Sequence, residues 1–372
     1  MTTQQLTGRT DVRPYETQRS RRRKLPHPLL ITAALGAATA TAALLRRQFD
    51  HYALARLTQP GRTLFRADPA EFGLTGYQRV NLTTNDGLAL RGRFFPAYGY
   101  RGYQAGGGDA SDARPQGSII LVHGYGGNHD TLLEYIAWLV AAGYNVLAYD
   151  QRGSGQSDGE RVTLGAQEAH DVGAAIEWLL GHGEQNIAIY GFSMGGTTAI
   201  LAAAEYTDLK AVITDCAFAK LEEEIESRLR VRGYPHFVTA PLSRLTAATL
   251  TDHLQAEPGE HDAVNAVNWI SPRPLLLIHA GDDEVVDTSD AYALYDAAGE
   301  PRELWVTPHS VHTASYHDYP SEYQQRVIAT LERAFGKVDL CPDVPSSTQR
   351  LSIAATPRPN LSTLRATRPA CC

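Results

Sequence analysis

Apolar residues form short, uninterrupted runs through the middle of the chain, and longer amphipathic stretches separate these runs. Each run predicts a strand buried on both faces, because a strand with one wet face would alternate apolar and polar residues. The predicted strands are 118–122, 145–150, 186–190, 211–215, 274–279 and 302–307. The stretches between them predict helices at 130–142, 166–180, 194–206, 289–298 and 320–335. This order favours an α/β fold, a mostly parallel central sheet of about eight strands with helices on both faces.

Two segments depart from this rhythm. Residues 77–83 and 88–95 flank Asp86-Gly87, a strong signal for an antiparallel hairpin that leads into the sheet. Between 218 and 273 the alternation of strands and helices stops, and a charged helical stretch is followed by scattered prolines and aromatic residues. This segment is too long for an ordinary connection. We therefore expect a small, mostly helical cap at 218–273, inserted within a single domain that spans 60–337.

The two ends of the chain differ in composition from this body. Residues 1–24 carry a balance of +5, which leaves −12 for the remainder of a chain whose net charge is −7. Residues 1–24 and 338–372 are polar and lack a periodic apolar pattern, so we expect both tails to be disordered. A body this acidic is not attracted to the phosphate backbone, so we exclude nucleic acid as a partner.

An uncharged apolar stretch at 29–45 follows the basic cluster Arg21-Arg22-Arg23-Lys24. Extended to 25–47, it reaches the ~20 residues that are needed to span a bilayer. The preceding basic residues place the N-terminus in the cytoplasm, so we expect a membrane-spanning signal anchor with the catalytic domain outside the cytoplasm. A cleaved signal peptide with small residues at Ala38-Thr39-Ala40 would instead give a secreted protein. A soluble or peripheral cytoplasmic protein is the third interpretation.

One motif carries most of the expected chemistry: Gly191-Phe192-Ser193-Met194-Gly195 lies between a predicted strand and a predicted helix. In this context the pattern predicts a sharp turn that presents the serine as a nucleophile. Glycines on both sides give the helix room to pack against the strand that it has just left. Phe192 is then free to face a substrate pocket.

The loop after the first buried strand, His123-Gly124-Tyr125-Gly126, predicts a second part of an acyl-transfer site. Acyl transfer requires N–H donors aimed at the oxygen that becomes negatively charged. We expect the backbone N–H groups of Tyr125 and Met194 to form this oxyanion hole, and Tyr125 also to contact the substrate. His123 is expected to be structural, since it lies at the strand end before the turn.

A nucleophilic serine requires a base, and the base requires an acid that fixes its tautomer. Three histidines follow the last predicted strand and four carboxylates follow the strand before it, and the residues alone do not separate them: His309, His312, His317, Asp282, Asp283, Glu284 and Asp287. The order serine, acid, histidine is that of nucleophile-elbow enzymes. Such a cluster could hold a metal. Because no His-x-x-x-His motif lies on a predicted helix, we expect neither a metal nor a cofactor.

Over 77–335 the chain resembles the α/β-hydrolase superfamily. The resemblance rests on the order of five motifs: His-Gly-Tyr-Gly at 123–126, Asp-Gln-Arg-Gly-Ser-Gly-Gln-Ser at 150–157, Gly-Phe-Ser-Met-Gly-Gly at 191–196, Ile-His-Ala-Gly-Asp-Asp-Glu-Val-Val at 278–286, and the late histidine loop. When residues 278–287 are aligned with the family pattern Ile-His-Gly-x-x-Asp-x-x-Val-Pro, the resemblance implies that Asp283 is the acid. The small residues before the catalytic histidine, and the Tyr and Pro after it, imply His312 as the base.

This resemblance implies a serine hydrolase that cleaves a small-molecule carboxylic ester or a related acyl bond through an acyl-enzyme intermediate. Aminopeptidase-like and acyltransferase activities on the same three residues remain open alternatives. A non-catalytic, membrane-anchored binding protein is a further alternative. The presence of all three residues and of both oxyanion loops argues against it.

Overall fold

The structure, a computed structural model, describes residues 28–59, 61–62, 65–97, 115–231 and 233–336. The tails predicted at 1–24 and 338–372 lie outside these residues. The chain divides into two compact units, Met1–Ala55 and Arg56–Cys372. All strands that the structure describes, and the candidate site, belong to the second unit.

Helix α1 runs from Pro28 to Thr58. Among the described residues, no helix is both long enough and apolar enough to cross a bilayer. The membrane-spanning anchor predicted at 25–47 is therefore not supported. The physical reason lies in the composition of α1, because alanine and threonine supply much of its uncharged part and Arg46 and Arg47 lie within the helix rather than beyond its end.

Eight strands in the described part of the chain form one sheet with the order β1-β2-β4-β3-β5-β6-β7-β8. Their bounds are β1 Gln78–Thr83, β2 Ala89–Phe95, β3 Ser118–Val122, β4 Asn145–Tyr149, β5 Ile187–Phe192, β6 Leu209–Asp215, β7 Leu275–Ala280 and β8 Arg302–Thr307. Strands β3 to β8 are parallel to one another, whereas β1 and β2 form an antiparallel hairpin, and β2 pairs antiparallel with β4. The predicted mostly parallel sheet is confirmed.

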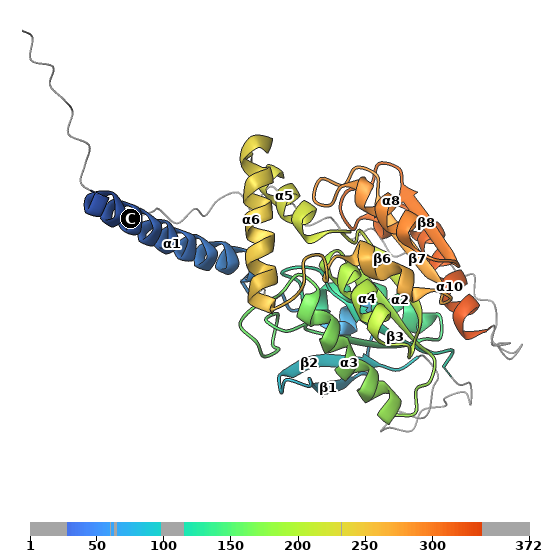
Figure 1. Cartoon of the computed structure of the whole chain (residues 1–372). Helices are drawn as coiled ribbons and strands as arrows, with labels where there is room; N and C mark the ends of the chain where they lie inside the picture. The colour runs from blue at the N-terminus through green and yellow to red at the C-terminus, as the bar shows by residue number, and fades with distance from the viewer. Residues whose placement is uncertain (1–27, 60, 63–64, 98–114, 232, 337–372) are drawn as a thin grey trace, which may run out of the picture. The chain divides into compact units, whose positions relative to one another are not determined.

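Helices cover both faces of this sheet (Figure 1). The bounds are α2 Leu133–Ala141, α3 Ala166–Gly181, α4 Met194–Glu205, α5 Leu221–Val231, α6 His236–Leu254, α7 Ala263–Ala266, α8 Thr288–Ala297, α9 Ser315–Asp318 and α10 Pro320–Phe335, with short 3-10 turns at η1 Pro69–Phe72, η3 His129–Leu132 and η4 Val267–Ile270. One apolar core contains side chains of α3, α4 and α8, and the other contains side chains of α2 and α10.

Strand β3 shows why the strands read as uninterrupted apolar runs. Ile120 and Val122 belong to the first core and Ile119 and Leu121 to the second, and all four are fully buried. A side chain alternates between the faces at every residue, so a strand between two helical layers needs apolar residues at all positions. Each buried strand therefore reads as an uninterrupted apolar run that ends where the polar residues of the next loop begin.

The segment between β6 and β7 contains α5 and α6, which pack against each other (Figure 1). Helix α5 has three glutamates in its first turn and two arginines in its last turn, a distribution that favours a helix by opposing its dipole. Helix α6 continues through Pro241. Together, α5 and α6 form the cap segment.

Candidate active site

Ser193 lies at the turn between β5 and α4. Its backbone has φ 53° and ψ −121°, a left-handed conformation that is costly for a residue with a side chain. The turn is tight on both sides, because a Cβ on Gly191 would lie 1.9 Å from the carbonyl oxygen of Gly195, and one on Gly195 would lie 2.2 Å from that of Val122. The Ser193 N–H donates to the carbonyl of Asp215 at 2.7 Å, which ties the turn to the end of β6.

The structure brings Ser193, His312 and Asp283 together from three strand ends. The Oγ of Ser193 lies 2.9 Å from Nε2 of His312, and Nδ1 of His312 lies 2.6 Å from Oδ2 of Asp283. A carboxylate can only accept, so Nδ1 of His312 carries the proton and Nε2 is left to accept from the serine hydroxyl. Ser193 and Asp283 are separated by 90 positions in sequence.

Asp283 is held in the ionised form by its neighbours. Burial opposes ionisation, but the hydrogen bond and charge of His312 and the N–H groups of Val285 and Val286 outweigh it and lower the pKa of Asp283. The two N–H groups donate to Oδ1 at 2.8 and 2.9 Å. His279, whose Nε2 donates to the carbonyl of Val286 at 3.1 Å, packs beside this loop, and burial lowers its pKa.

The other candidates for acid and base lie elsewhere. His309 and Asp282 face each other across 3.4 Å at the surface, and the side chain of His309 is 89% exposed. His317 lies 3.7 Å from Glu134, and Asp287 caps the start of α8 by accepting from the Ser289 N–H. Only the pair His312 and Asp283 reaches Ser193 among the described residues.

The loop after β3 lies against the turn at Ser193. A Cβ on Gly124 would lie 3.2 Å from the Cβ of Ser193, so the glycine permits this approach. His123 is buried, its Nε2 accepts from the Gln151 N–H at 3.1 Å, and burial lowers its pKa. It is a structural residue, as expected. Met194 is the first residue of α4, where the helix offers no acceptor for the N–H group.

Tyr125 is fixed at both ends of its side chain. Its hydroxyl donates to the carbonyl of Leu57 at 2.8 Å, and the guanidinium carbon of Arg228 lies 4.4 Å from its ring centre. Arg228 in turn forms an ion pair with Glu224, one turn earlier on α5. Glu224 is 2% exposed, and burial raises its pKa although Arg228 opposes that shift. Sequence reasoning missed this buried pair, because (i, i+4) charges are usually exposed.

Phe192, predicted to line a substrate pocket, is buried in the second apolar core. Its ring centre lies 4.5 Å from those of Tyr135 and Tyr190. These three aromatic side chains thus pack directly beside Ser193, the residue that follows Phe192. A contact of Phe192 with substrate stays a prediction.

One group of side chains near the site has the composition of a metal site. Ligand atoms of Cys216, Asp283 and His312 lie within 4.8 Å of one another. Burial raises the pKa of the Cys216 thiol well above its usual value, which disfavours the thiolate that a metal requires. The thiol donates instead to Asp215 at 3.2 Å, and the other two residues are bonded to each other. These contacts fit hydrogen-bonded side chains better than metal ligands.

Asp215, the last residue of β6, is hydrogen-bonded both to α10 and to the turn at Ser193. It is fully buried, and burial raises its pKa. The Tyr323 hydroxyl on α10 donates to its Oδ2 at 2.6 Å. The residue therefore links α10 to the end of β6, next to the carbonyl that receives the Ser193 N–H.

Comparison with known protein sequences supports the superfamily. Residues 113–273 match the family model of serine aminopeptidases, S33. The uncharacterized protein YqkD of Bacillus subtilis (strain 168) is 29% identical over 238 residues, which cover 62% of this chain and 75% of YqkD. The uncharacterized protein YfhR of Escherichia coli (strain K12) is 27% identical over 257 residues, which cover 68% of this chain and 79% of YfhR.

Solved structures share the fold. The esterase Pf2001 of Pyrococcus furiosus superposes with a TM-score of 0.58 at 24% identity, covering 74% of this chain and all of the esterase. A puromycin-hydrolyzing peptidase of Mycobacterium tuberculosis superposes with a TM-score of 0.54 at 19% identity, covering 70% of this chain and 40% of the peptidase. At these identities the similarity concerns the fold.

Proposed function

Because the chain belongs to the α/β-hydrolase superfamily, we propose that it is a serine hydrolase that cleaves carboxylic esters, with Ser193 as nucleophile, His312 as base and Asp283 as acid. The observation that carries this proposal is the unbroken hydrogen-bond path from Ser193 Oγ through both ring nitrogens of His312 to Asp283. A serine hydroxyl is a weak nucleophile until a base removes its proton.

In the proposed acylation step, Ser193 Oγ attacks the carbonyl carbon while Nε2 of His312 takes the hydroxyl proton. The resulting imidazolium passes this proton to the leaving alcohol as the carbon–oxygen bond breaks. Asp283 keeps the proton of Nδ1 in place and stabilises the positive ring. Its lowered pKa supports this role, because the carboxylate is ionised wherever His312 must become charged.

In the proposed deacylation step, water attacks the acyl carbon while Nε2 of His312 takes its proton. The bond from that carbon to Ser193 Oγ then breaks, His312 returns the proton to Oγ, and the carboxylic acid leaves. The negative oxygen of each tetrahedral intermediate would accept from the backbone N–H groups of Met194 and Tyr125. Removal of one oxyanion donor costs ~3 kcal/mol in other hydrolases. The close approach of the β3 loop to Ser193 at Gly124 supports this placement of Tyr125.

A fluorophosphonate probe tests the nucleophile. We expect the probe to label the wild-type protein covalently and to leave Ser193→Ala unlabelled. A folded wild-type protein that resists the probe would sink the proposal. Hydrolysis of p-nitrophenyl esters, measured beside p-nitroanilides of amino acids, tests whether the ester is the preferred substrate.

Two histidine variants form a matched pair for the base. We expect His312→Ala to abolish most ester turnover and His309→Ala to retain it, because His309 is exposed and paired with Asp282 rather than with Ser193. The reverse result would assign the base to His309 instead.

A further inference from the structure

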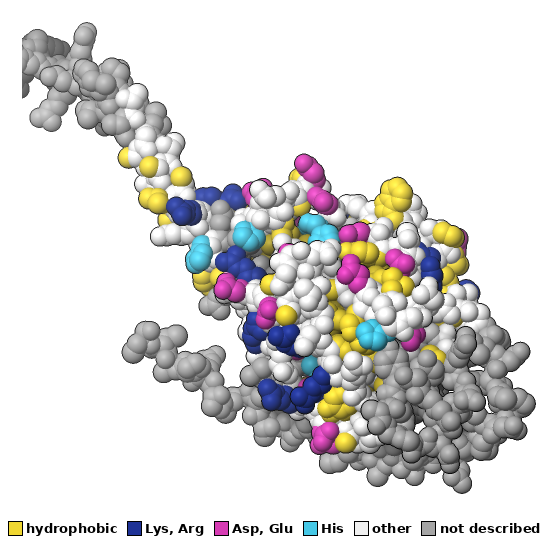
Figure 2. Space-filling model, turned by 90° about the horizontal axis from the view of Figure 1, so that it is seen from below, with side chains coloured by type: hydrophobic (Ala, Val, Ile, Leu, Met, Phe, Trp, Pro, Cys, Tyr) yellow, Lys and Arg dark blue, Asp and Glu magenta, His cyan; other side chains and the backbone are white. Residues whose placement is uncertain are grey.

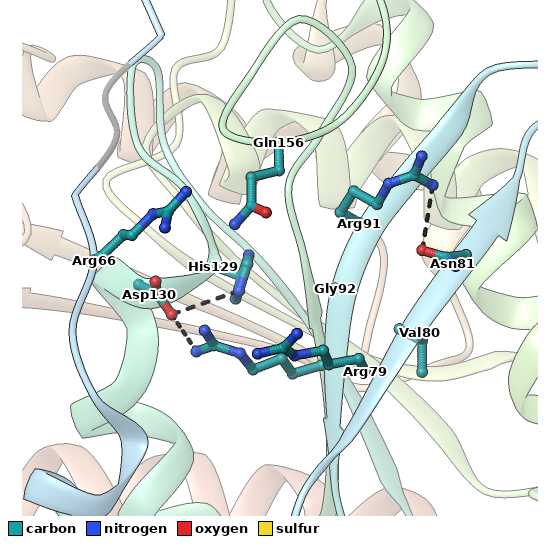
Figure 3. A pocket seen from close by; sticks show the side chains of 10 residues that line it. Arg66, Arg79, Val80, Asn81, Arg91, Gly92, His129, Asp130 and Gln156 are labelled. Carbon is teal, nitrogen blue, oxygen red and sulfur yellow. Dashed lines mark hydrogen bonds and ion pairs between the residues drawn. The ribbon is translucent and has the colours of Figure 1, made fainter.

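A cavity lies outside the candidate active site, beside the β1–β2 hairpin. Its volume is about 340 Å³, within the range of small-ligand pockets. Figure 3 shows its lining, which comes from the hairpin, from the segment before it and from the loops after β3 and β4. Neither Ser193 nor His312 nor Asp283 lines it.

Arginines dominate this cavity, and they reach it from different directions. Arg66 comes from the segment before the hairpin, and Arg79 and Arg91 lie across the cavity from it (Figure 3). The lining contains four arginines and one carboxylate. The arginines are Arg66, Arg79, Arg91 and Arg93, and the carboxylate is Asp130. The formal charge of the lining is therefore strongly positive in a body that is otherwise acidic. The face shown in Figure 2 carries Lys and Arg side chains interspersed with Asp, Glu and His side chains.

The strand register sets two of these arginines against each other. Arg79 of β1 lies directly opposite Arg93 of β2, and Asn81 lies opposite Arg91. Like charges in directly opposed positions destabilise an antiparallel pair. The ion pair from Arg93 to Asp130 relieves part of this repulsion. Arg66 and Arg79 form no ion pair or hydrogen bond with any residue that the structure describes.

A buried histidine also lines the cavity. His129 is 3% exposed and lines the cavity. Its Nδ1 is bound to Asp150 at 2.6 Å, and the same carboxylate accepts its backbone N–H at 2.8 Å. Its Nε2 has no hydrogen-bond partner among the described residues and lies 3.5 Å from Asp130 Oδ1. Buried polar atoms are rarely left without a partner unless a ligand or water supplies one.

We propose that this cavity, the arginine pocket, binds the phosphate group of a phosphorylated molecule. Guanidinium groups bind phosphate through paired N–H donors, and a tetrahedral dianion can meet arginines that converge from several directions. A planar carboxylate monoanion would neutralise less of the lining. The phosphate belongs either to a free small molecule or to a lipid headgroup, and this site is independent of the proposed ester chemistry.

Thermal unfolding of the full chain tests the site, with sodium phosphate compared with sodium chloride at matched pH and ionic strength. We expect phosphate to raise the Tm of the wild-type protein in a saturable way and Arg79→Gln to weaken its apparent affinity about tenfold. In chloride, Arg79→Gln should be no less stable than wild type, because it removes the repulsion with Arg93. Arg66→Gln is the second variant, and its backbone lies outside the sheet.

The control is Arg230→Gln, which removes an exposed arginine of α5 outside the pocket and should leave the phosphate response unchanged. An equal phosphate response of wild type, Arg79→Gln and Arg66→Gln would overturn the proposal, as would no response of wild type. Sodium acetate should give a smaller shift than phosphate. A Tm shift in acetate as large as that in phosphate would contradict the proposal that the pocket binds phosphate.

Vesicle flotation separates the two sources of phosphate. Binding of the wild type to phosphatidylcholine vesicles that contain phosphatidic acid, lost in Arg79→Gln, assigns the pocket to a lipid headgroup. A saturable phosphate shift without vesicle binding assigns it to a free phosphorylated molecule. Vesicle binding that Arg79→Gln retains excludes the pocket as the lipid site.

Discussion

The guanidinium group of Arg228 lies over the ring of Tyr125, so the cap segment and the loop after β3 meet at one contact. The same guanidinium forms an ion pair with Glu224, whose side chain is buried. We expect Arg228→Gln to lower the free energy of unfolding by about 3 kcal/mol, because it leaves a buried carboxylate without its counter-charge.

The double variant Glu224→Gln/Arg228→Gln removes both charges. It should recover most of the stability that the single variant loses, since a neutral pair requires no buried charge. Urea denaturation of the wild type, Glu224→Gln, Arg228→Gln and the double variant measures the interaction free energy between the two side chains. A double variant as unstable as Arg228→Gln would show that lost packing rather than charge causes the effect.

Asp283→Asn tests how His312, the proposed base, is oriented. The amide would present no charge to His312 and would favour the wrong tautomer, so we expect kcat for an ester substrate to fall about 10⁴-fold. The hydrogen bond to the ring should remain possible, so the Km should change little. A loss of less than tenfold would show that Asp283 does not act as the acid.

The same variant has a signature in the pH dependence of stability. The folded-state pKa of Asp283 lies below its unfolded value of 3.8, so its ionisation stabilises the fold above that pH and the gain is lost as the pH falls through the folded pKa. The difference in stability between wild type and Asp283→Asn should therefore shrink at acid pH. Urea midpoints measured from pH 3 to pH 7 check this.

Asp290 should behave in the opposite direction. Burial raises its pKa to about 7, although its Oδ1 accepts the Ala219 N–H at 2.7 Å. A raised carboxyl pKa contributes stability that is fully present below the unfolded value of 3.8 and is lost as the pH rises towards 7. At pH 8 we expect Asp290→Asn to be more stable than wild type, by up to about 4 kcal/mol, because an amide oxygen can still accept that N–H.

The measurement is the free energy of unfolding of both proteins at pH 5 and pH 8. The advantage of Asp290→Asn should be smaller at pH 5, where much of the wild-type carboxyl is already protonated in the folded state. An advantage that does not change with pH would contradict the assignment of the raised pKa to Asp290.

Two glycine variants compare a crowded position with an open one. A Cβ on Gly195 would lie 2.2 Å from the carbonyl oxygen of Val122, whereas nothing lies within 4 Å of one on Gly181, the last residue of α3. We expect Gly195→Ala to cost about 3 kcal/mol and to abolish ester turnover. Gly181→Ala should be neutral or stabilise by up to about 1 kcal/mol, since alanine favours the helix. Thermal unfolding and turnover measure both.

The strands of the sheet could be predicted from the sequence, because each strand is marked by its own apolar run and by the polar residues that flank it. The predicted strands 118–122 and 302–307 coincide with β3 and β8, since the burial of both faces leaves an apolar run that polar loop residues interrupt. The hairpin was predicted for a similar reason: the turn residue Gly87 has φ 86°, which favours glycine. The position of each loop at the sheet edge then followed from parallel topology.

The arginine pocket could not be predicted from the sequence. Its residues are scattered from 66 to 156, and neither their spacing nor their type forms a motif. The opposition of Arg79 and Arg93 depends on the register of two strands, and the position of His129 depends on how Asp150 holds it. Helix α6 was also missed as one element, because Pro241 within it suggested an interruption.

The strand order has a consequence for how activity is lost. In the described sheet β8 lies at an open edge and pairs only with β7, and His312 follows β8, whereas Ser193 lies on the interior strand β5. Separation of β8 from β7 would withdraw His312, the proposed base, while the turn at Ser193 stayed intact. Openings at an edge cost less free energy than global unfolding. On gentle heating, inactivation should therefore be reversible and should precede the loss of the sheet.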